Sequence, residues 1–118
     1  MVVPEPQVVI VIRRDLKLPK GKLAVQAAHA TASLVMKTKS KPVFSEWMMV
    51  GQKKVAVWAD DEKHLLAIKR AAEDRSIPTV LIKDAGRTVV AAGTTTCIAI
   101  GPADAVDLEP VTGDLSLI

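Results

Sequence analysis

Residues 7–38 read QVVIVIRRDLKLPKGKLAVQAAHATASLVMKT and contain the two patterns that decide the fold. The run QVVIVIR at 7–13 is rich in β-branched residues, which predicts a strand buried on both faces of a sheet. A turn-like segment with Pro19 and Gly21 follows. Residues 22–38 contain neither glycine nor proline and are rich in helix-forming residues, which predicts one long helix. The stretch therefore forms a strand followed by a helix, the unit from which α/β proteins are built.

The rest of the chain continues this alternation. Asp60 and Asp61 suit the start of a helix, which Ser76 and Pro78 end. The remaining patterns predict a short helix at 42–50, strands at 53–58, 79–83 and 95–100, a glycine-containing loop at 84–94, a short helix at 105–108 and an extended end at 115–118.

The lengths of the connections predict how the strands pair. The loop before the last strand is too short for a parallel crossover, which is usually a helix, so the last two strands are expected to be antiparallel neighbours. The earlier strands are separated by helices, which favours parallel pairing. We therefore expect a single α/β domain over residues 1–118, in which a mixed four-stranded sheet is flanked by helices in three α/β/α layers.

Composition narrows the class of protein. The 118 residues are 49% hydrophobic and 25% charged, which is typical of one globular domain. The apolar run at 8–12 is too short to span a membrane and no secretory leader precedes it, so we expect a soluble, cytoplasmic protein without membrane contact. Cys97 has no partner for an internal disulfide, and with His29 and His64 it forms no metal-ligand spacing, so no metal is expected.

Positive charge is concentrated in one half of the sequence. Residues 1–59 carry ten Lys or Arg and three Asp or Glu, a net charge of +7, whereas residues 60–118 carry a net charge of −4. A basic field of this kind favours a polyanion such as RNA, although a solvated lysine-rich surface explains the charge equally well. The candidate RNA-binding residues are Arg13, Arg14, Lys17, Lys20 and Lys37.

Four polar side chains share one side of the helix expected at 22–38. At about 100° per residue, Lys22, Gln26, His29 and Ser33 fall within about 60° of one another and include no acid. An ordinary solvent face would mix acids with the lysines, so the stripe as a set indicates a site. Taken singly, Lys22 is typical of a surface lysine. The arc expected to pack on the sheet contains Leu23, Ala24, Ala27, Ala28, Ala30, Thr31, Leu34 and Val35.

The common nucleotide and nucleophile motifs are absent. Gly21 and Lys22 do not form a phosphate-binding P-loop, because Leu16 stands where that motif needs its first glycine and Leu23 where it needs Ser or Thr. The patterns G-x-G-x-x-G and G-x-S-x-G do not occur either. The sequence therefore predicts neither a dinucleotide site nor a serine nucleophile.

A second polar segment follows the strand expected at 79–83. Asp84 ends that strand and is expected at its carboxyl edge, where α/β proteins place ligands. If the first and third strands are parallel, Lys22 lies on the same rim. Thr88 lies in the loop, and alternation places Thr96 and Thr95 on opposite faces of the last strand. A turn former and simple β-propensity are the structural alternatives for the aspartate and the threonines.

The chain resembles the type II peptidyl-tRNA hydrolases, the archaeal and eukaryotic kind, over nearly its whole length. The most specific matches are K-G-K-x-A-x-Q-x-A-H-A at 20–30 and D-A-G-x-T at 84–88, followed by Gly93-Thr94. The segments GQKKVAVW, TTTCIAIGPA and VTGDLSLI follow the family in order and spacing. Ala91-Ala92 stands where the family often has prolines, and Asp114 and Ser116 replace a more basic tail.

The resemblance implies an activity and a set of site residues. Family members release tRNA by hydrolysing the ester between a peptide and the terminal ribose of peptidyl-tRNA, with no cofactor implied. The residues that match the family's functional positions are Lys22, Gln26, Asp84, Thr88 and Thr96, with His29 and Ser33 as supporting candidates.

Two other functions stay open at this point. The same fold could serve as a non-catalytic RNA-binding or adaptor domain, because a fold alone does not determine activity. A related esterase could instead edit misacylated tRNA. The sequence also leaves a homodimer open.

Overall fold

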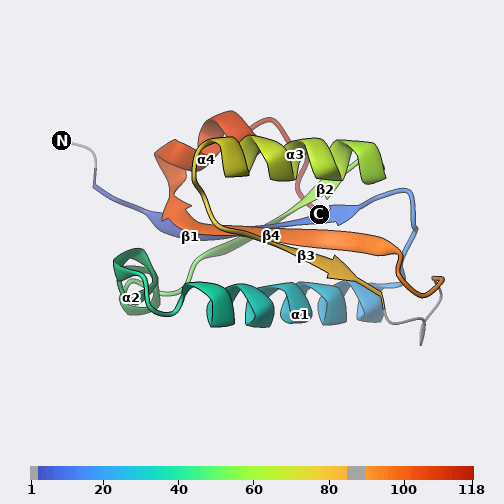
Figure 1. Ribbon diagram of the computed structural model, residues 1–118, viewed down its shortest axis with the longest axis horizontal. Coiled ribbons are helices and arrows are strands. Elements are labelled where there is room, and N and C mark those ends of the chain that lie inside the picture. The colour runs from blue at the N-terminus through green and yellow to red at the C-terminus, as the bar shows by residue number, and fades with distance from the viewer. Residues whose placement is uncertain (1–2, 85–89) are drawn as a thin grey trace.

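A computed structural model describes residues 3–84 and 90–118 of the protein. The helices and strands alternate along the chain as expected (Figure 1). In chain order they are β1 (Pro6–Arg13), α1 (Lys20–Thr38), α2 (Pro42–Met49), β2 (Lys54–Ala59), α3 (Glu62–Asp74), β3 (Thr79–Lys83), β4 (Thr95–Asp104) and α4 (Ala105–Thr112).

The strands form one mixed four-stranded sheet in the order β2-β1-β4-β3. β1 pairs with β2 in parallel and with β4 antiparallel, and β3 pairs with β4 antiparallel. The predicted fold class and the predicted antiparallel pairing of the last two strands are confirmed. Because β1 and β3 both run opposite to β4, they point the same way. We call the edge where β1 and β3 end and β4 begins the rim.

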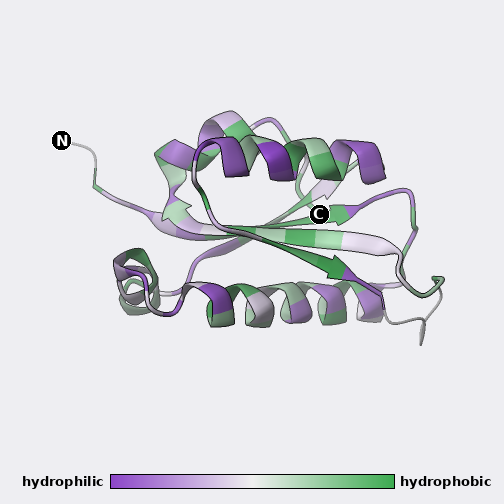
Figure 2. Ribbon diagram, viewed as in Figure 1, coloured by the Kyte–Doolittle hydropathy of each residue, from purple (hydrophilic) through white to green (hydrophobic). Residues whose placement is uncertain are grey.

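Helices cover both faces of the sheet. Figure 1 shows α1 and α2 on one face and α3 and α4 on the other, which is the expected three-layer arrangement. The sheet residues alternate between two cores, since Ile10 and Ile12 pack toward Leu34 of α1 while Val9 and Val11 lie in the core that contains Leu65 of α3. Figure 2 shows the strands largely in hydrophobic colours between helices that also carry hydrophilic residues. Burial on both faces explains the continuous apolar run of β1.

The observed helix α1 begins earlier than predicted. It starts at Lys20 rather than at 22, so Gly21 lies inside the helix and not in a turn. Pro19 is the N-cap residue with an extended backbone (φ −60°, ψ 157°), and Leu23 donates its backbone N–H to the Pro19 carbonyl at 2.9 Å. Because proline lacks an N–H and fixes φ, it is well suited to precede the first turn.

The strand β4 and the helix α4 are longer than predicted. β4 continues past 100 to Asp104, because Gly101 (φ 113°) and Pro102 bend the strand instead of ending it. Its last residues still pair with β1, as Gln7 lies opposite Ala103 after a shift in register. The helix expected at 105–108 runs on to Thr112 and includes a proline.

The extended C-terminal end pairs with the outer edge of β2. Trp58 donates its backbone N–H to the Ser116 carbonyl at 2.9 Å, and Ile118 donates to the Ala56 carbonyl at 3.0 Å. An isolated antiparallel bridge joins Leu117 to Val57. The tail therefore covers backbone groups that an unpaired edge strand would otherwise expose.

Candidate active site

An ion pair joins α1 to the end of β3 at the rim. Lys22 Nζ lies 3.3 Å from Asp84 Oδ2, and the exposed fractions of the two side chains are 15% and 2%. The backbone of Asp84 also closes the loop that follows it, because its N–H donates to the Thr94 carbonyl at 2.8 Å and its own carbonyl accepts from Gly93 at 2.7 Å. The structure thus brings together two residues that the sequence placed on one rim, and it buries the carboxylate.

A second polar contact lies beneath the helix. Thr96 Oγ1 donates to Gln26 Oε1 at 2.7 Å, and both residues are buried. Because this bond occupies the amide oxygen, the two amide hydrogens of Gln26 stay available as donors. Gln26 and Thr96 therefore form a fixed polar contact between α1 and β4.

The expected polar stripe on α1 is only partly correct. Gln26 packs against the sheet, Lys22 and Ser33 are half-buried, and His29 is exposed. The buried face of α1 consists of Gln26, Ala30, Leu34 and Thr38. The expectation that Ala24 and Ala28 pack on the sheet is wrong, since both are exposed. The error arises because a buried glutamine that finds a hydrogen-bond partner in the sheet can replace an apolar residue.

A β-bulge at the start of β4 explains how Thr96 reaches Gln26. Ile82 of β3 lies opposite Cys97, but Lys83 lies opposite Thr95, so Thr96 is the extra residue in β4. A bulge breaks the regular alternation of side chains and re-aims the residues within it. Thr96 and Cys97 consequently both contact Gln26 on the α1 face, because Cys97 Sγ lies 3.8 Å from the Gln26 carbonyl oxygen. The sequence-based prediction placed Thr95 and Thr96 on opposite faces by simple alternation and did not include the bulge.

Cys97 is the single cysteine of the sequence, and it contacts Gln26 and is fully buried. Burial raises the pKa of Cys97 to about 11, against the opposing effect of its hydrogen bond with Thr96. The thiol is therefore neutral at physiological pH, and a neutral thiol is a poor nucleophile. This cysteine contributes packing beneath the site and no thiolate chemistry.

The two arginines at the end of β1 differ in their surroundings. The guanidinium of Arg13 is bound to Asp15, to the Thr95 carbonyl and to Glu62. The hydrogen bond from Arg13 lowers the pKa of Asp15 and raises the pKa of Arg13 itself. Arg14 is exposed and places its guanidinium carbon 5.6 Å from the centre of the Trp58 ring.

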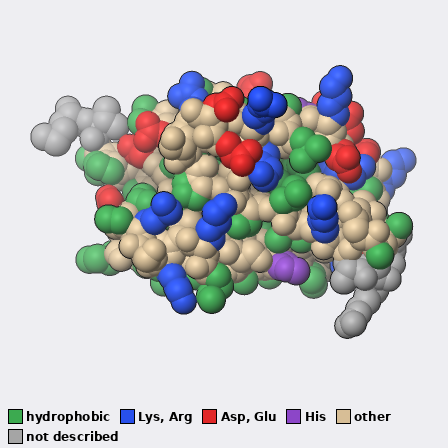
Figure 3. All heavy atoms as spheres, viewed as in Figure 1, with side chains coloured by type: hydrophobic (Ala, Val, Ile, Leu, Met, Phe, Trp, Pro, Cys, Tyr) green, Lys and Arg blue, Asp and Glu red, His purple; other side chains and the backbone are tan. Residues whose placement is uncertain are grey.

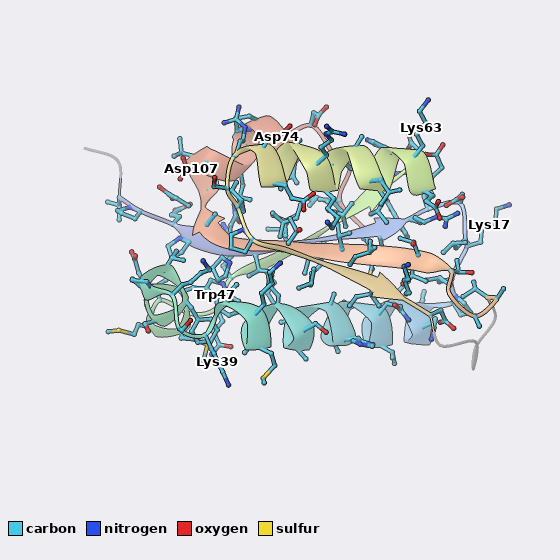
Figure 4. The ribbon with its side chains drawn as sticks, in the orientation of Figure 1. Lys17, Lys39, Trp47, Lys63, Asp74 and Asp107 are labelled. Atoms are coloured by element: carbon cyan, nitrogen blue, oxygen red, sulfur yellow. The ribbon has the colours of Figure 1, made fainter. Side chains whose placement is uncertain are left out.

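The basic residues predicted to bind RNA do not form a single cluster. Lys17 and Lys20 are exposed beside the rim, in the β1–α1 loop and at the start of α1. Lys37 lies at the opposite end of α1 and donates to the Thr79 carbonyl at 2.6 Å. Figure 4 shows this separation, with Lys17 at one end of the molecule and Lys39, two residues after Lys37, at the other.

Charge is also divided between the layers. Figure 3 shows acidic side chains gathered, among Lys and Arg, on the α3–α4 side of the view, whereas Lys or Arg, a histidine and apolar side chains lie on the α1 side. A polyanionic substrate is therefore favoured on the α1 side, next to the rim. Within residues 3–84 and 90–118, no group of three or more His, Cys, Asp or Glu could hold a metal ion, and no helix is both long and apolar enough to cross a membrane.

Some features of the site were missed from the sequence or lie beyond the structure. Thr88 falls outside the described residues, so its predicted role stays a prediction. No role was predicted for Asp15 from the sequence, yet Asp15 lies in the turn directly after β1, only two residues from Arg13, and this closeness of opposite charges could have suggested the pair. No comparable signal marks the bulge among three consecutive threonines.

These observations define a class, a three-layer α/β protein with a buried carboxylate–lysine site at one rim of its sheet. The family model described as Peptidyl-tRNA hydrolase PTH2 matches residues 7–118. The chain belongs to this peptidyl-tRNA hydrolase family.

Relatives named "Peptidyl-tRNA hydrolase" match the chain along nearly their full lengths. The protein from Thermococcus onnurineus is 50% identical over 112 residues, which cover 93% of this chain and 95% of the relative. The protein from Methanopyrus kandleri is 45% identical over 93% of this chain and 96% of its own. The protein from Saccharolobus islandicus is 39% identical over 95% of this chain and 98% of its own.

Proposed function

We propose that the chain hydrolyses the ester bond between a peptide and the terminal ribose of tRNA, and that Lys22 and Asp84 carry out this reaction. The observation that carries the proposal is the 3.3 Å ion pair on a carboxylate that is only 2% exposed. Family membership supplies the substrate class, and the basic α1 side suits the RNA part of such a substrate. A charge pair at a rim offers both an acceptor for water and a donor for an oxyanion.

Asp84 orients the attacking water. Ester hydrolysis needs a water molecule aimed at the carbonyl carbon, and a carboxylate accepts hydrogen bonds from water. An ionised carboxylate is a weak base, so its contribution is chiefly to position the water at the reacting carbon. Burial and the backbone bonds at Asp84 keep this acceptor in one place.

Lys22 and Gln26 stabilise the negative charge that forms on the ester oxygen. An ammonium has three donor hydrogens, so Lys22 can pair with Asp84 and still donate to an oxyanion. Gln26 adds its amide hydrogens, and Thr96 fixes that amide by binding its oxygen. Donors held in place before the reaction stabilise charge more effectively than donors that must reorganise. Thr88, Ser33 and His29 are supporting candidates in this proposal.

The substrate RNA lies along the basic surface beside the rim. Arg14, Lys17 and Lys20 are exposed there and are the proposed phosphate contacts. Lys37 lies 15 residues after Lys22 on α1, about 22 Å away at 1.5 Å per residue, so it would reach a different part of the tRNA than the reacting end. We place the reaction in the cytoplasm, where translation uses tRNA. A homodimer is a separate proposal, and sedimentation equilibrium tests it.

The experiment is single-turnover hydrolysis of N-acetyl-lysyl-tRNA, in which the release of the N-acetyl-lysine is measured over time. Lys22→Ala and Asp84→Asn should each lower the rate by about 10²-fold or more, because each removes a group that acts on the transition state. Lys39→Ala is the matched control, since Lys39 is an exposed lysine at the far end of α1. Near-normal rates in both site variants would overturn the proposal.

The same assay separates the alternative functions. An adaptor would bind N-acetyl-lysyl-tRNA without releasing tRNA. An editing esterase would hydrolyse free lysyl-tRNA at least as fast as the N-blocked form. The proposed hydrolase cleaves the N-blocked substrate and clearly prefers it to the free one.

A further inference from the structure

The guanidinium of Arg13 is almost fully engaged within the protein. Its Nε and Nη2 donate to the two carboxylate oxygens of Asp15 at 3.0 and 2.8 Å, and its Nη1 donates to the Thr95 carbonyl at 2.9 Å. Nη1 also lies 3.5 Å from Glu62 Oε2, and only 12% of the side chain is exposed. The paired bonds to Asp15 hold the guanidinium plane in one orientation. All three guanidinium nitrogens therefore have partners.

The contact between Arg13 and Thr95 lies at the point where the pairing of β1 with β4 ends. The ladder between β1 and β4 ends with Ile12 opposite Cys97, and Thr96 is the bulge residue immediately before that pair. A bulge interrupts regular pairing and leaves its residue without a place in the ladder. The Arg13 side chain reaches past the last paired position and binds the carbonyl of the residue before the bulge. Both neighbours of Thr96 are therefore held, Cys97 by its pairing with Ile12 and Thr95 by its hydrogen bond with Arg13.

We propose that Arg13 is a positioning residue for the hydrolytic reaction, which holds the bulged start of β4 so that the Thr96 hydroxyl stays on Gln26. This inference rests on the proposed function, because its main consequence is a change in turnover. Arg13 acts through the Thr95 carbonyl and Thr96, and Asp15 keeps the guanidinium aimed at that carbonyl. The role differs from that of a phosphate ligand, which would need the guanidinium to face solvent.

Arg14 provides a matched comparison. It is the next residue and also an arginine, but it is exposed and stacks over Trp58. A phosphate ligand and a positioning residue affect different kinetic constants. Loss of a phosphate contact raises KM and weakens the dependence of binding on salt, whereas loss of a positioning contact lowers kcat. The two neighbouring arginines should therefore give opposite patterns.

The first experiment compares Arg13→Met, Arg13→Lys, Arg14→Met and Arg70→Met in steady-state hydrolysis of N-acetyl-lysyl-tRNA. Arg13→Met should lower kcat by about 10-fold or more and leave KM within about twofold, since small displacements at a reacting centre are costly. Arg13→Lys, which keeps a donor for the Thr95 carbonyl, should recover part of kcat. Arg14→Met should mainly raise KM. Arg70→Met removes an exposed arginine of α3 and should change neither constant.

The variant Asp15→Asn should affect KM and kcat differently depending on whether Arg13 binds phosphate or positions β4. If Arg13 served as a phosphate ligand, removing its acidic partner would free the guanidinium and lower KM with kcat unchanged. If Arg13 positions β4, the same change loosens the guanidinium and lowers kcat. An unchanged kcat in both Asp15→Asn and Arg13→Met would overturn the proposal.

Coupling to Thr96 separates positioning from a general loss of stability. In a Thr96→Val background, Arg13→Lys should cause little further loss of kcat, because the hydroxyl that it positions is already gone. Full additivity of the two losses would contradict the proposal. Circular dichroism and cooperative unfolding show whether each variant is folded, and Arg13→Lys retains the charge if Arg13→Met does not fold.

A readout without activity keeps this proposal distinct from the proposed function. The methyl resonance of Thr96 in NMR spectra should shift in Arg13→Lys and stay in place in Arg70→Met. If the unmodified chain did not hydrolyse N-acetyl-lysyl-tRNA, the proposed function would fail, while the NMR comparison would still decide whether Arg13 holds Thr96. An unmoved Thr96 resonance in Arg13→Lys would overturn the positioning role.

Discussion

Thr96 and Gln26 are 70 residues apart in the sequence and share a buried hydrogen bond of 2.7 Å. The bond joins the last strand of the sheet to the first helix, four residues after Lys22 on α1. It contributes to structure, because both partners are buried, and to the proposed chemistry, because it determines which atoms of Gln26 are free to donate. Stability and activity can therefore be measured on the same contact.

Thr96→Val removes the donor and keeps the shape of the side chain. It should lower the free energy of unfolding by about 1–3 kcal/mol, since Gln26 loses a buried partner, and should also lower turnover of N-acetyl-lysyl-tRNA. Thr96→Ser should retain most activity. The control is Thr38→Val, which removes a buried hydroxyl that donates within α1 to the Leu34 carbonyl at 2.8 Å. That variant should keep full activity, and equal losses of activity in the two valine variants would contradict a special role for Thr96.

Lys22→Met leaves the buried carboxylate of Asp84 without this cation. The free energy of unfolding should fall by about 2 kcal/mol, because loss of one partner from a largely buried pair exposes the cost of burying the other. Adding Asp84→Asn to Lys22→Met should recover part of that loss, since a neutral amide is cheaper to bury than a carboxylate that has lost its lysine. Guanidinium unfolding of both variants measures the difference. If the double variant were less stable than Lys22→Met, Lys22 would not be the main partner of the Asp84 carboxylate.

Gly101→Ala should destabilise the fold by about 2–4 kcal/mol. The residue has φ 113°, and an added Cβ would lie 2.8 Å from the Gln7 carbonyl oxygen, which belongs to the backbone and cannot move easily. Gly21→Ala is the matched control, because Gly21 lies in α1 and an added Cβ would meet no atom within 4 Å. The control should be neutral or more stable by up to about 1 kcal/mol. Thermal or denaturant unfolding of the two variants checks the contrast.

Cys97 should be inert in the folded protein. With a pKa of about 11, only about one thiol in a thousand is ionised at pH 8, and the side chain is fully buried. An aromatic disulfide reagent at pH 8 should therefore report no rapid reaction with native protein and one thiol per chain after denaturation in guanidinium. Raising the pH toward 11 while the protein stays folded should increase the rate only as far as access allows. Rapid labelling at pH 8 would show that the thiol is neither buried nor neutral.

Much of the rim could be predicted because it follows from direction and order along the chain. The helices between the earlier strands favour parallel pairing and the short loop before β4 favours an antiparallel pair, and in the structure β1 and β3 do point the same way. Once these directions are known, Lys22 after β1 and Asp84 after β3 must fall on one rim. The 3.3 Å contact between them is the detail that only the structure supplies.

The interior of the site could not be predicted in the same way. The helical projection of α1 grouped Gln26 with the polar stripe. Nothing in the sequence around Gln26 indicates that a buried hydroxyl on the sheet will bind its side chain. Regular alternation along β4 does not hold between Thr96 and Cys97, because the register of β4 shifts against β3 and no residue type in the run TTTC requires a bulge. Both errors concern long-range contacts, whereas helix and strand periods describe only local geometry.

The extra residue in β4 also has a consequence for how this site could arise or be lost. A strand of the same composition without the insertion would still pair with β1 and β3 and cover the same cores, but alternation would turn the Thr96 hydroxyl away from α1. Under the proposed mechanism, activity in this fold depends partly on the length of a strand and not only on its side chains. A single-residue deletion near 96 could leave every proposed catalytic residue present in the sequence, yet it would separate the Thr96 hydroxyl from Gln26.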